Sequence, residues 1–371
     1  MTSDADFYHL ELLLDDAERD LLHRVRTFME KEVAPVINRY WVAAQFPHEL
    51  VPGLRDLGIA GLPYAGYGCG GARPLVDGLV ALELARTDPS IATFMGVHGG
   101  LAMGSIYVCG SDEQRERWLP AMARMEKIGA FGLTEPDVGS GAARGLTTTA
   151  RRDGDGWVLR GQKNWIGNAT FADLIVIWAR DIADGQVKGF VVEKGTAGLA
   201  TEKLQDKIAL RVVQNARSFR DTAEVLRLTR AGVAWMAVGC GRGAYEHALA
   251  YATRREQFGR PIGGFQLVQD LLVRMLGNIT ASAALCAQLA SLQAAGAAAD
   301  EHSALAKAFC TVRMRETVGW ARELMGGNGI LLEHNVGRFV ADAEAIYSYE
   351  GTREMNTLIV GRKITGISAF V

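Results

Sequence analysis

The segment Phe131-Gly-Leu-Thr-Glu-Pro-Asp-Val-Gly-Ser140 ends a run of β-type residues in a polar turn. It also marks the point at which the pattern of the chain changes. Upstream, apolar residues such as Leu21, Val25 and Phe28 recur at helical spacing, whereas downstream short β-type runs alternate with Gly, Asp and Asn turns as far as Glu193. The helical period returns near residue 222. The order helical, β, helical predicts a mainly α fold with a central β domain.

Three domains follow from this order. We expect a helical domain over residues 1–128, a β domain over 129–216 and a helical bundle over 217–371. Ser111 with Gln114 three residues later has the form of a capping box, which predicts a helix that begins at Asp112.

The composition excludes several classes of partner. Of 371 residues, 49% are hydrophobic and 22% charged, and the formal net charge of −2 gives no reason to expect nucleic acid or an anionic membrane. The five cysteines form neither a CxxC pair nor a metal-ligand spacing. We therefore expect reduced thiols in a reducing compartment and no metal site.

We recognise no targeting signal in the first or last residues of the sequence. The first residues, Met1-Thr-Ser-Asp-Ala-Asp6, lack the features of a signal or transit peptide, and Ser368-Ala-Phe-Val371 is not a peroxisomal signal. No run of about 18 apolar residues is free of polar interruption, so no membrane span is predicted. We expect a cytoplasmic protein.

Four further motifs are ambiguous when each is considered alone. Trp165-Ile-Gly-Asn168 could be plain core, and Arg254–Ile262 could bind pyrophosphate or be a solvated helix end. Gly326–Ile330 is too short for a dinucleotide fingerprint and fits a helix terminus. Glu350 in Tyr349-Glu-Gly-Thr352 could be a surface charge before a helix. The turn at 131–140 could hold a polar cofactor or simply end a strand.

Together these motifs resemble the acyl-CoA dehydrogenase family over nearly the whole chain. The match rests on five motifs in the family's order: Leu-Thr-Glu-Pro at 133–136, Trp-Ile-Gly-Asn at 165–168, Arg-x-Gln-Phe-Gly-Arg-Pro at 255–261, Gly-Gly-Asn-Gly at 326–329 and Tyr-Glu-Gly-Thr at 349–352. The ending Thr357–Phe370 is similar to the glutaryl-CoA dehydrogenase and short-chain acyl-CoA oxidase branch. The resemblance implies an N-terminal helical domain, a middle β-barrel domain and a C-terminal four-helix bundle.

The resemblance also implies FAD as cofactor, held between the β domain and the C-terminal helices and shared between subunits of a homotetramer. The cofactor-binding residues implied are Phe131, Leu133, Thr134, Ser140, Trp165, Gly167, Arg255, Gln257, Phe258, Gln266, Gly326, Gly327, Thr352 and Glu354. Those implied for the substrate are Ser140, Arg230 and Gly351. Gly167 stands where many relatives have threonine, and Arg227 stands where the acidic or amide partner of Arg230 is usual.

Glu350 matches the family's catalytic base. In the family this carboxylate takes the α-proton of an acyl-CoA thioester while a hydride leaves the β-carbon for flavin N5, which gives a trans-2-enoyl-CoA. The thioester carbonyl needs stabilisation as charge develops, and excluding water strengthens the base. An electron-transfer flavoprotein is the expected electron acceptor, in fatty-acid β-oxidation.

The sequence departs from the pattern of the family at two places. Glutaryl-CoA dehydrogenases hold the second carboxylate of their substrate with an arginine, and a glutamate lies nearby. In this sequence Ala92 stands at the position of the arginine and Ala85 at that of the glutamate. A buried carboxylate without a cation is costly, so we expect a neutral acyl chain. After Ala216 the strand that closes the β domain in relatives is missing, and one interpretation is that residues are absent from the sequence at this point.

Two other functions share these motifs. An acyl-CoA oxidase would use the same base but pass its electrons to O2, and a non-catalytic helical binding protein could keep the fold without the reaction. The sequence leaves the length and branching of the acyl chain open.

Overall fold

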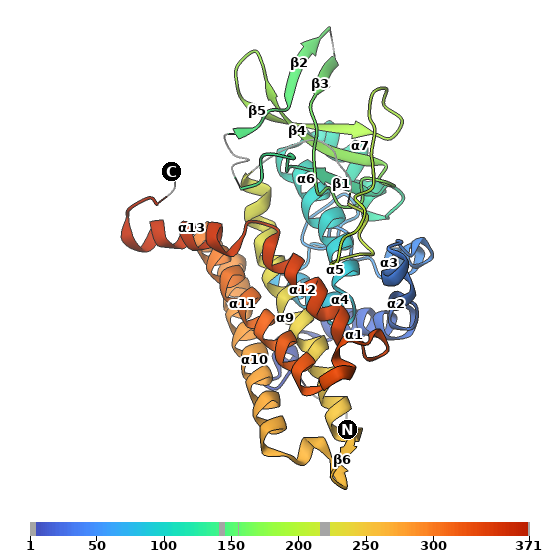
Figure 1. Ribbon diagram of the computed structural model, residues 1–371. Coiled ribbons are helices and arrows are strands. Elements are labelled where there is room, and N and C mark those ends of the chain that lie inside the picture. Colours follow the sequence, from blue (N-terminus) through green and yellow to red (C-terminus); the bar gives the residue numbers. More distant parts are fainter. Residues whose placement is uncertain (1–4, 141–144, 155, 216–222, 370–371) are drawn as a thin grey trace.

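The computed structural model describes residues 5–140, 145–154, 156–215 and 223–369. Figure 1 shows a sheet at one end of the molecule and long C-terminal helices that extend away from it, with the N-terminal helices packed alongside. The order helical, β, helical is that of the acyl-CoA dehydrogenase fold expected from the sequence.

The N-terminal helices are α1 (Asp16–Phe28), α2 (Ala34–Ala43), α3 (Val51–Asp56), α4 (Pro74–Thr87), α5 (Pro89–Met95), α6 (Gly104–Cys109) and α7 (Asp112–Ala123). The capping box predicted for α7 is present, since the Ser111 side chain accepts from Gln114 N and the Gln114 side chain accepts from Ser111 N. Two π-helical segments, η2 (Met29–Val33) and η4 (Gly96–Met103), join α1 to α2 and α5 to α6. Single π turns inside α-helices are frequent at functional sites.

The sheet is built around β4 (Leu174–Asp181), which is almost entirely buried. Strand β1 (Gly129–Gly132) pairs with it in parallel and β5 (Val187–Glu193) antiparallel. Strand β2 (Thr149–Asp153) meets the end of β4 and forms a hairpin with β3 (Gly156–Arg160). Because both faces of β4 are covered, its sequence Leu-Ile-Val-Ile-Trp-Ala is continuously apolar. The turn that follows β1 is thereby fixed at the edge of the core.

The C-terminal part consists of α9 (Ala223–Arg254), α10 (Gln266–Ala294), α11 (Asp300–Leu324), α12 (Val336–Ser348) and α13 (Arg353–Thr365). A two-residue-strand hairpin, β6 (Glu256–Gln257) with β7 (Arg260–Pro261), joins α9 to α10. Helix α9 packs against α4 at close range, because a Cβ at Gly239 or Gly243 would lie 2.2 Å from Leu82 O and 2.1 Å from Arg86 O. This contact fixes α9 against the N-terminal helices.

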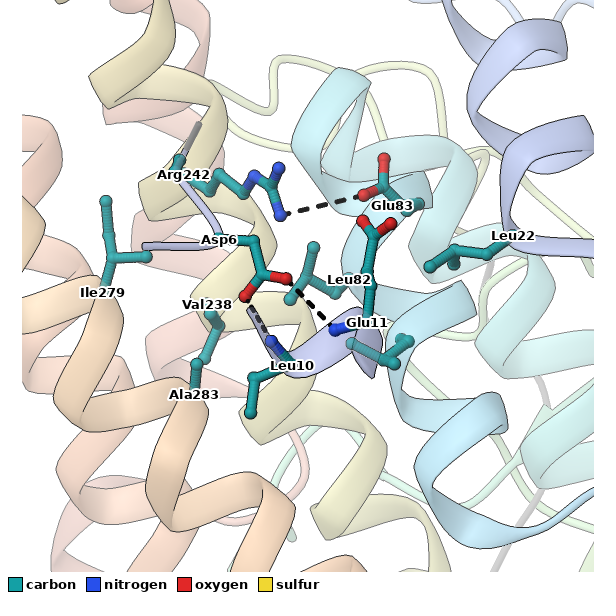
Figure 2. A pocket seen from close by; sticks show the side chains of 12 residues that line it. Asp6, Leu10, Glu11, Leu22, Leu82, Glu83, Val238, Arg242, Ile279 and Ala283 are labelled. Carbon is teal, nitrogen blue, oxygen red and sulfur yellow. Dashed lines mark hydrogen bonds and ion pairs between the residues drawn. The ribbon is translucent and has the colours of Figure 1, made fainter. Parts of the chain in front are cut away.

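A small pocket lies between the N-terminal segment and helices α4, α9 and α10 (Figure 2). The Asp6 carboxylate accepts from Leu10 N and Glu11 N at 2.9 and 3.1 Å, and Arg242 lies 3.9 Å from Glu83. None of the residues predicted for the active site lines this pocket. The ion pair of Arg242 with Glu83 joins α9 to α4 beside this pocket.

Two helical stretches are long and apolar enough to be membrane-span candidates by length and composition alone. Pro89–Cys109 is 72% buried in the fold and Gln266–Ala294 is 39% buried, the latter packed against α9 and α11. Buried helices of soluble proteins pass the same test. The absence of a membrane span stays a prediction.

Between Lys194 and Asn215 the segment after β5 forms no further strand of the sheet. In the described part of the chain, β5 pairs with β4 alone. The predicted gap after Ala216 falls on residues 216–222, which lie outside the described residues. Whether a closing strand is missing therefore stays a prediction.

Candidate active site

The turn Tyr349–Gly351 joins α12 to α13 in an uncommon backbone conformation. Glu350 and Gly351 have φ values of 55° and 82°, and a left-handed conformation at a residue with a side chain costs about 1 kcal/mol or more. Thr352 then caps α13, because its side chain accepts from Met355 N at 3.3 Å. The turn aims the Glu350 side chain back toward the bundle, where it meets α9.

The Glu350 carboxyl group is enclosed although the residue as a whole is partly accessible. Thr229 Oγ1 donates a hydrogen bond of 2.7 Å to Glu350 Oε2. Burial raises the pKa of Glu350, while the Thr229 hydroxyl and the charges of Arg230 and Lys307 act in the opposite direction. Burial is the larger effect, so this carboxyl group binds a proton more readily than an exposed glutamate.

Arg230, predicted to bind substrate, lies beside this carboxyl group. Its Nη1 is 2.5 Å from Asp300 Oδ1 at the start of α11. The acidic partner that the sequence lacks at Arg227 is thus supplied from another helix. The side chain of Arg227 lies outside the described residues.

The turn after β1 is held by a buried ion pair. Lys163 Nζ lies 2.7 Å from Glu135 Oε1 and donates to Leu133 O at 2.9 Å. Thr147 and Thr148 add three hydrogen bonds to the same carboxylate. Burial raises the pKa of Glu135, but these donors outweigh it and hold the pKa at about 2.

This arrangement brings two of the predicted flavin-facing segments together. Asn164 N donates to Thr134 O at 2.8 Å, which places Trp165 next to the turn that carries Leu133. Phe131 is buried in β1. Ser140 is exposed and borders residues outside the described part of the chain.

Trp165 leaves much of its indole uncovered, with 57% of the residue exposed. Its backbone is left-handed at φ 67°, and its carbonyl accepts from Asn215 Nδ2 at 3.2 Å. Gly167 is buried, and a Cβ there would lie 3.0 Å from Val97 Cγ2 and 3.5 Å from Val213 Cγ1. A side chain at this position would therefore be crowded by Val97.

The other predicted cofactor residues form two further groups. At the far end of α9, Asn328 Nδ2 donates to Tyr251 OH at 2.8 Å, and the Phe258 and Phe265 rings lie 6.0 Å apart. These contacts gather one group at that end: Arg255, Gln257, Phe258, Gln266, Gly326 and Gly327. Thr352 and Glu354 lie at the start of α13, next to Glu350. Figure 1 shows the β6 hairpin and the sheet at opposite ends of the molecule.

One chain therefore does not bring the α9 end and the Trp165 segment together. The sequence predicts that residues of the α9 end reach the FAD of a neighbouring subunit, and this stays a prediction. The surfaces themselves fit such a cofactor. Phe258 is 93% exposed, and Asn164 Oδ1, beside Trp165, is buried without a hydrogen-bond partner in the described part of the chain. A flat ring system with polar edges would cover the aromatic faces and satisfy that acceptor.

Two residues near Glu350 were not predicted from the sequence. Thr229 directly precedes Arg230, and nothing in its immediate sequence marks it. Lys307 is a lone charge in the apolar stretch Ala304-Leu-Ala-Lys-Ala-Phe-Cys310 of α11, and it is completely buried. A lysine in the middle of an apolar run was the signal that could have identified it.

Comparison with known proteins agrees with this geometry. The chain matches the acyl-CoA dehydrogenase N-terminal domain over residues 15–126, the middle domain over 130–221 and the C-terminal domain over 219–365. A short-chain specific acyl-CoA dehydrogenase of Clostridium acetobutylicum is 31% identical, over 94% of this chain and 98% of that protein.

Solved structures show the same fold. Glutaryl-CoA dehydrogenase from Mycobacterium smegmatis superposes with a TM-score of 0.94 at 37% identity, covering 99% of both chains. A glutaryl-CoA dehydrogenase from the same organism, in complex with FADH2, gives 0.93 at 34% identity, covering 98% of both chains.

The chain belongs to the acyl-CoA dehydrogenase family. It is an oxidoreductase with the three-domain fold of that family, which confirms the family, the fold class and the type of enzyme predicted from the sequence.

Proposed function

We propose that this protein converts an acyl-CoA thioester into a trans-2-enoyl-CoA, with Glu350 as the base that removes the α-proton. The observation that carries the proposal is the enclosed Glu350 carboxyl group, whose pKa burial raises. A carboxylate that is poorly stabilised by donors is a stronger base than one in water. A weakly acidic thioester α-proton requires such a base.

The neighbouring residues orient this base. The Thr229 hydroxyl binds Oε2, which leaves Oε1 as the oxygen that receives the proton. Arg230 and Lys307 place positive charge nearby, which favours the ionised form of the carboxyl group.

FAD is the cofactor that the family and the FADH2-bound relative indicate, and when bound it accepts the hydride from the β-carbon. The exposed face of Trp165 and the turn at Leu133–Thr134 would hold its ring. Arg255, Gln257, Phe258, Gln266, Gly326 and Gly327 would serve the cofactor of a neighbouring subunit, which supports a homotetramer built as a dimer of dimers. Light scattering on the purified protein tests the subunit number.

A neutral acyl chain is the proposed substrate. Ala92 and Ala85, which stand where glutaryl-specific relatives carry charged side chains, are buried at 3% and 0% exposure. Neither can compensate a second carboxylate, whose burial without a partner is costly. The similarity to a short-chain specific relative supports this assignment, whereas the similarity to glutaryl-CoA dehydrogenases makes glutaryl-CoA the substrate to test against it.

The direct test is anaerobic bleaching of the flavin with butyryl-, hexanoyl- and glutaryl-CoA. We expect rapid bleaching by the neutral substrates and slow or no bleaching by glutaryl-CoA. Faster turnover of glutaryl-CoA would refute the substrate assignment but not the reaction. A colourless protein that cannot bind FAD would instead favour a non-catalytic binding protein.

Glu350→Gln tests the base. It should slow bleaching by about 10²- to 10⁴-fold, the usual contribution of a general base. Glu333→Gln is the matched control, because Glu333 is 73% exposed on its side chain and lies outside the site. Bleaching at the wild-type rate in Glu350→Gln would remove Glu350 as the base.

The proposed electron acceptor is an electron-transfer flavoprotein, in cytoplasmic fatty-acid β-oxidation. An oxidase would share the site described above and differ in passing electrons to O2. Peroxide production in air, at the rate of substrate consumption, would identify the oxidase.

A further inference from the structure

Lys307 is a completely buried lysine in the middle of α11. Its Nζ donates to Gly351 O at 2.6 Å and approaches Tyr347 O at 3.4 Å. Burial of an ammonium group is costly unless it is paired, and an apolar residue would pack at this helix position at lower cost. The contacts of Lys307 therefore point to a role other than packing.

The first of these contacts fixes the turn that carries Glu350. Gly351 O also accepts from Asn356 Nδ2 at 2.9 Å, so two donors, from α11 and α13, use both lone pairs of one carbonyl group. Asn356 Nδ2 lies 3.0 Å from Thr352 O as well. These bonds hold Glu350 and Gly351 in left-handed conformations that are unfavourable without such support.

The ammonium group also interacts electrostatically with the carboxyl group of the base. Burial lowers the pKa of Lys307 to about 8. The positive charge of Arg230 also lowers this pKa, whereas the negative charges of Glu350 and Glu354 raise it. At neutral pH Lys307 is still protonated. Its charge favours the ionised form of Glu350.

We propose that Lys307 is a positioning residue for the base: it anchors the Tyr349–Gly351 turn through the Gly351 carbonyl and places a positive charge near the Glu350 carboxyl group. The proposal rests on the proposed function, in which Glu350 removes the α-proton. It adds to the site a residue of α11 that contacts the turn carrying Glu350.

Three variants separate the two parts of this role. Lys307→Met removes both the charge and the donor, Lys307→Gln removes the charge and keeps a donor, and Asn356→Ala removes a donor without a change of charge. The acid limb of kcat/KM should move to higher pH by about one unit in both Lys307 variants and stay in place in Asn356→Ala. The value of kcat should fall by about tenfold in Lys307→Met and in Asn356→Ala, with little change in KM.

Lys207 provides a matched control. It is another largely buried lysine whose pKa burial lowers to about 8, and it donates to the carbonyl groups of Leu210 and Val213 at 2.9 and 2.6 Å. Its pKa responds to Asp342, Lys203 and Arg211 and not to Glu350. Lys207→Met removes a lysine of the same kind and should leave the acid limb unmoved.

A second readout is independent of turnover. The infrared carboxyl band of Glu350, identified by its loss in Glu350→Gln, titrates in the oxidised holoenzyme without substrate. Its midpoint should rise in Lys307→Met and Lys307→Gln relative to Lys207→Met. If Lys307→Met does not fold, Lys307→Gln carries the measurement.

The two proposals can fail separately. An unchanged infrared midpoint and acid limb in the Lys307 variants would overturn the role of Lys307 while Glu350→Gln still abolished bleaching. Normal bleaching in Glu350→Gln would overturn Glu350 as the base, whatever the Lys307 variants showed.

Discussion

Two enclosed glutamates in this molecule have opposite electrostatic environments. Glu135, in the turn after β1, accepts from Lys163 and from three donors on Thr147 and Thr148, and its pKa is held at about 2. Glu350, in the turn before α13, accepts from one hydroxyl group in the described part of the chain, and burial raises its pKa. Both belong to motifs of the family.

The difference separates a carboxylate that is stabilised as an anion from the one that we propose as the base. A carboxylate with several donors is stabilised as the anion and has little tendency to take a proton. A carboxylate that is enclosed and has few donors keeps a high affinity for a proton, and its burial lowers the stability of the folded protein. The turn after β1 and the turn before α13 should therefore respond differently to mutation and pH.

The largest expected effect is on stability at Glu135. Glu135→Gln should lower the free energy of unfolding by about 3–5 kcal/mol, because it removes the negative charge that lies 2.7 Å from the buried Lys163 ammonium group. Denaturant unfolding at pH 7 measures this loss. Glu350→Gln, as the matched change, should leave stability unchanged or raise it. A comparable loss in both variants would contradict the comparison.

The next largest effect is on how stability depends on pH, and it concerns His98. Like Glu135, His98 is a buried side chain near β1 that has hydrogen-bond partners. His98 Nδ1 accepts from Gly129 N at 2.9 Å and Nε2 lies 3.0 Å from Met122 O, and burial lowers its pKa from 6.5 to about 4. The unfolded chain therefore binds the proton first as the pH falls. The stability that neutral His98 contributes is present above pH 6.5 and is lost toward pH 4, by about 3 kcal/mol.

His98→Gln keeps one donor and one acceptor but does not titrate. Urea unfolding between pH 4 and 7 should show a shallower loss of stability in this variant than in the wild type. Part of the slope should remain, because burial also lowers the pKa of His247 to about 4. An unchanged slope would show that folding does not lower the pKa of His98.

A smaller effect is expected at Gly167, on the segment beside Trp165. Gly167→Thr should cost about 1–3 kcal/mol by overpacking against Val97, and Val97→Ala should recover part of that cost. Gly139→Thr is the control, since no atom of the described residues lies within 4 Å of a Cβ at Gly139. Thermal melts measure both. Equal tolerance at the two positions would show that crowding is not the reason for glycine at 167.

The smallest effect concerns the one hydroxyl group that binds Glu350. Thr229→Val should raise the pKa of Glu350, and so the acid limb of kcat/KM, by about one unit, because a hydrogen bond to the ionised form is lost. Thr229→Ser keeps the hydroxyl and should leave the limb in place. A shift of the limb to lower pH in Thr229→Val would reverse the assigned role of this bond.

Much of the fold could be predicted because its local signals agree with the tertiary structure. The apolar period of the helices, the short β-type runs and the capping box of Ser111 with Gln114 each depend on neighbours within a few residues. The order of the motifs then identified the family and its cofactor. Positions such as Trp165 and Thr134 lie side by side as expected, because each follows or precedes a strand of one sheet.

The electrostatic environment of the site could not be predicted in the same way. Asp300 pairs with Arg230 from 70 residues away, and Lys307 anchors Gly351 from 44 residues away. No local pattern indicates such pairs, because they depend on how α9, α11 and α13 pack. The shift in pKa of Glu350 is also a property of enclosure.

The sequence by itself thus predicted the order of helical and β segments, the family and Glu350 as the proposed base. Only the tertiary structure decided which side chains enclose that base and which of the two motif glutamates is stabilised as an anion. The physical reason is that helix and strand formation depends on short-range periodicity, whereas proton affinity depends on burial and on donors brought together by packing.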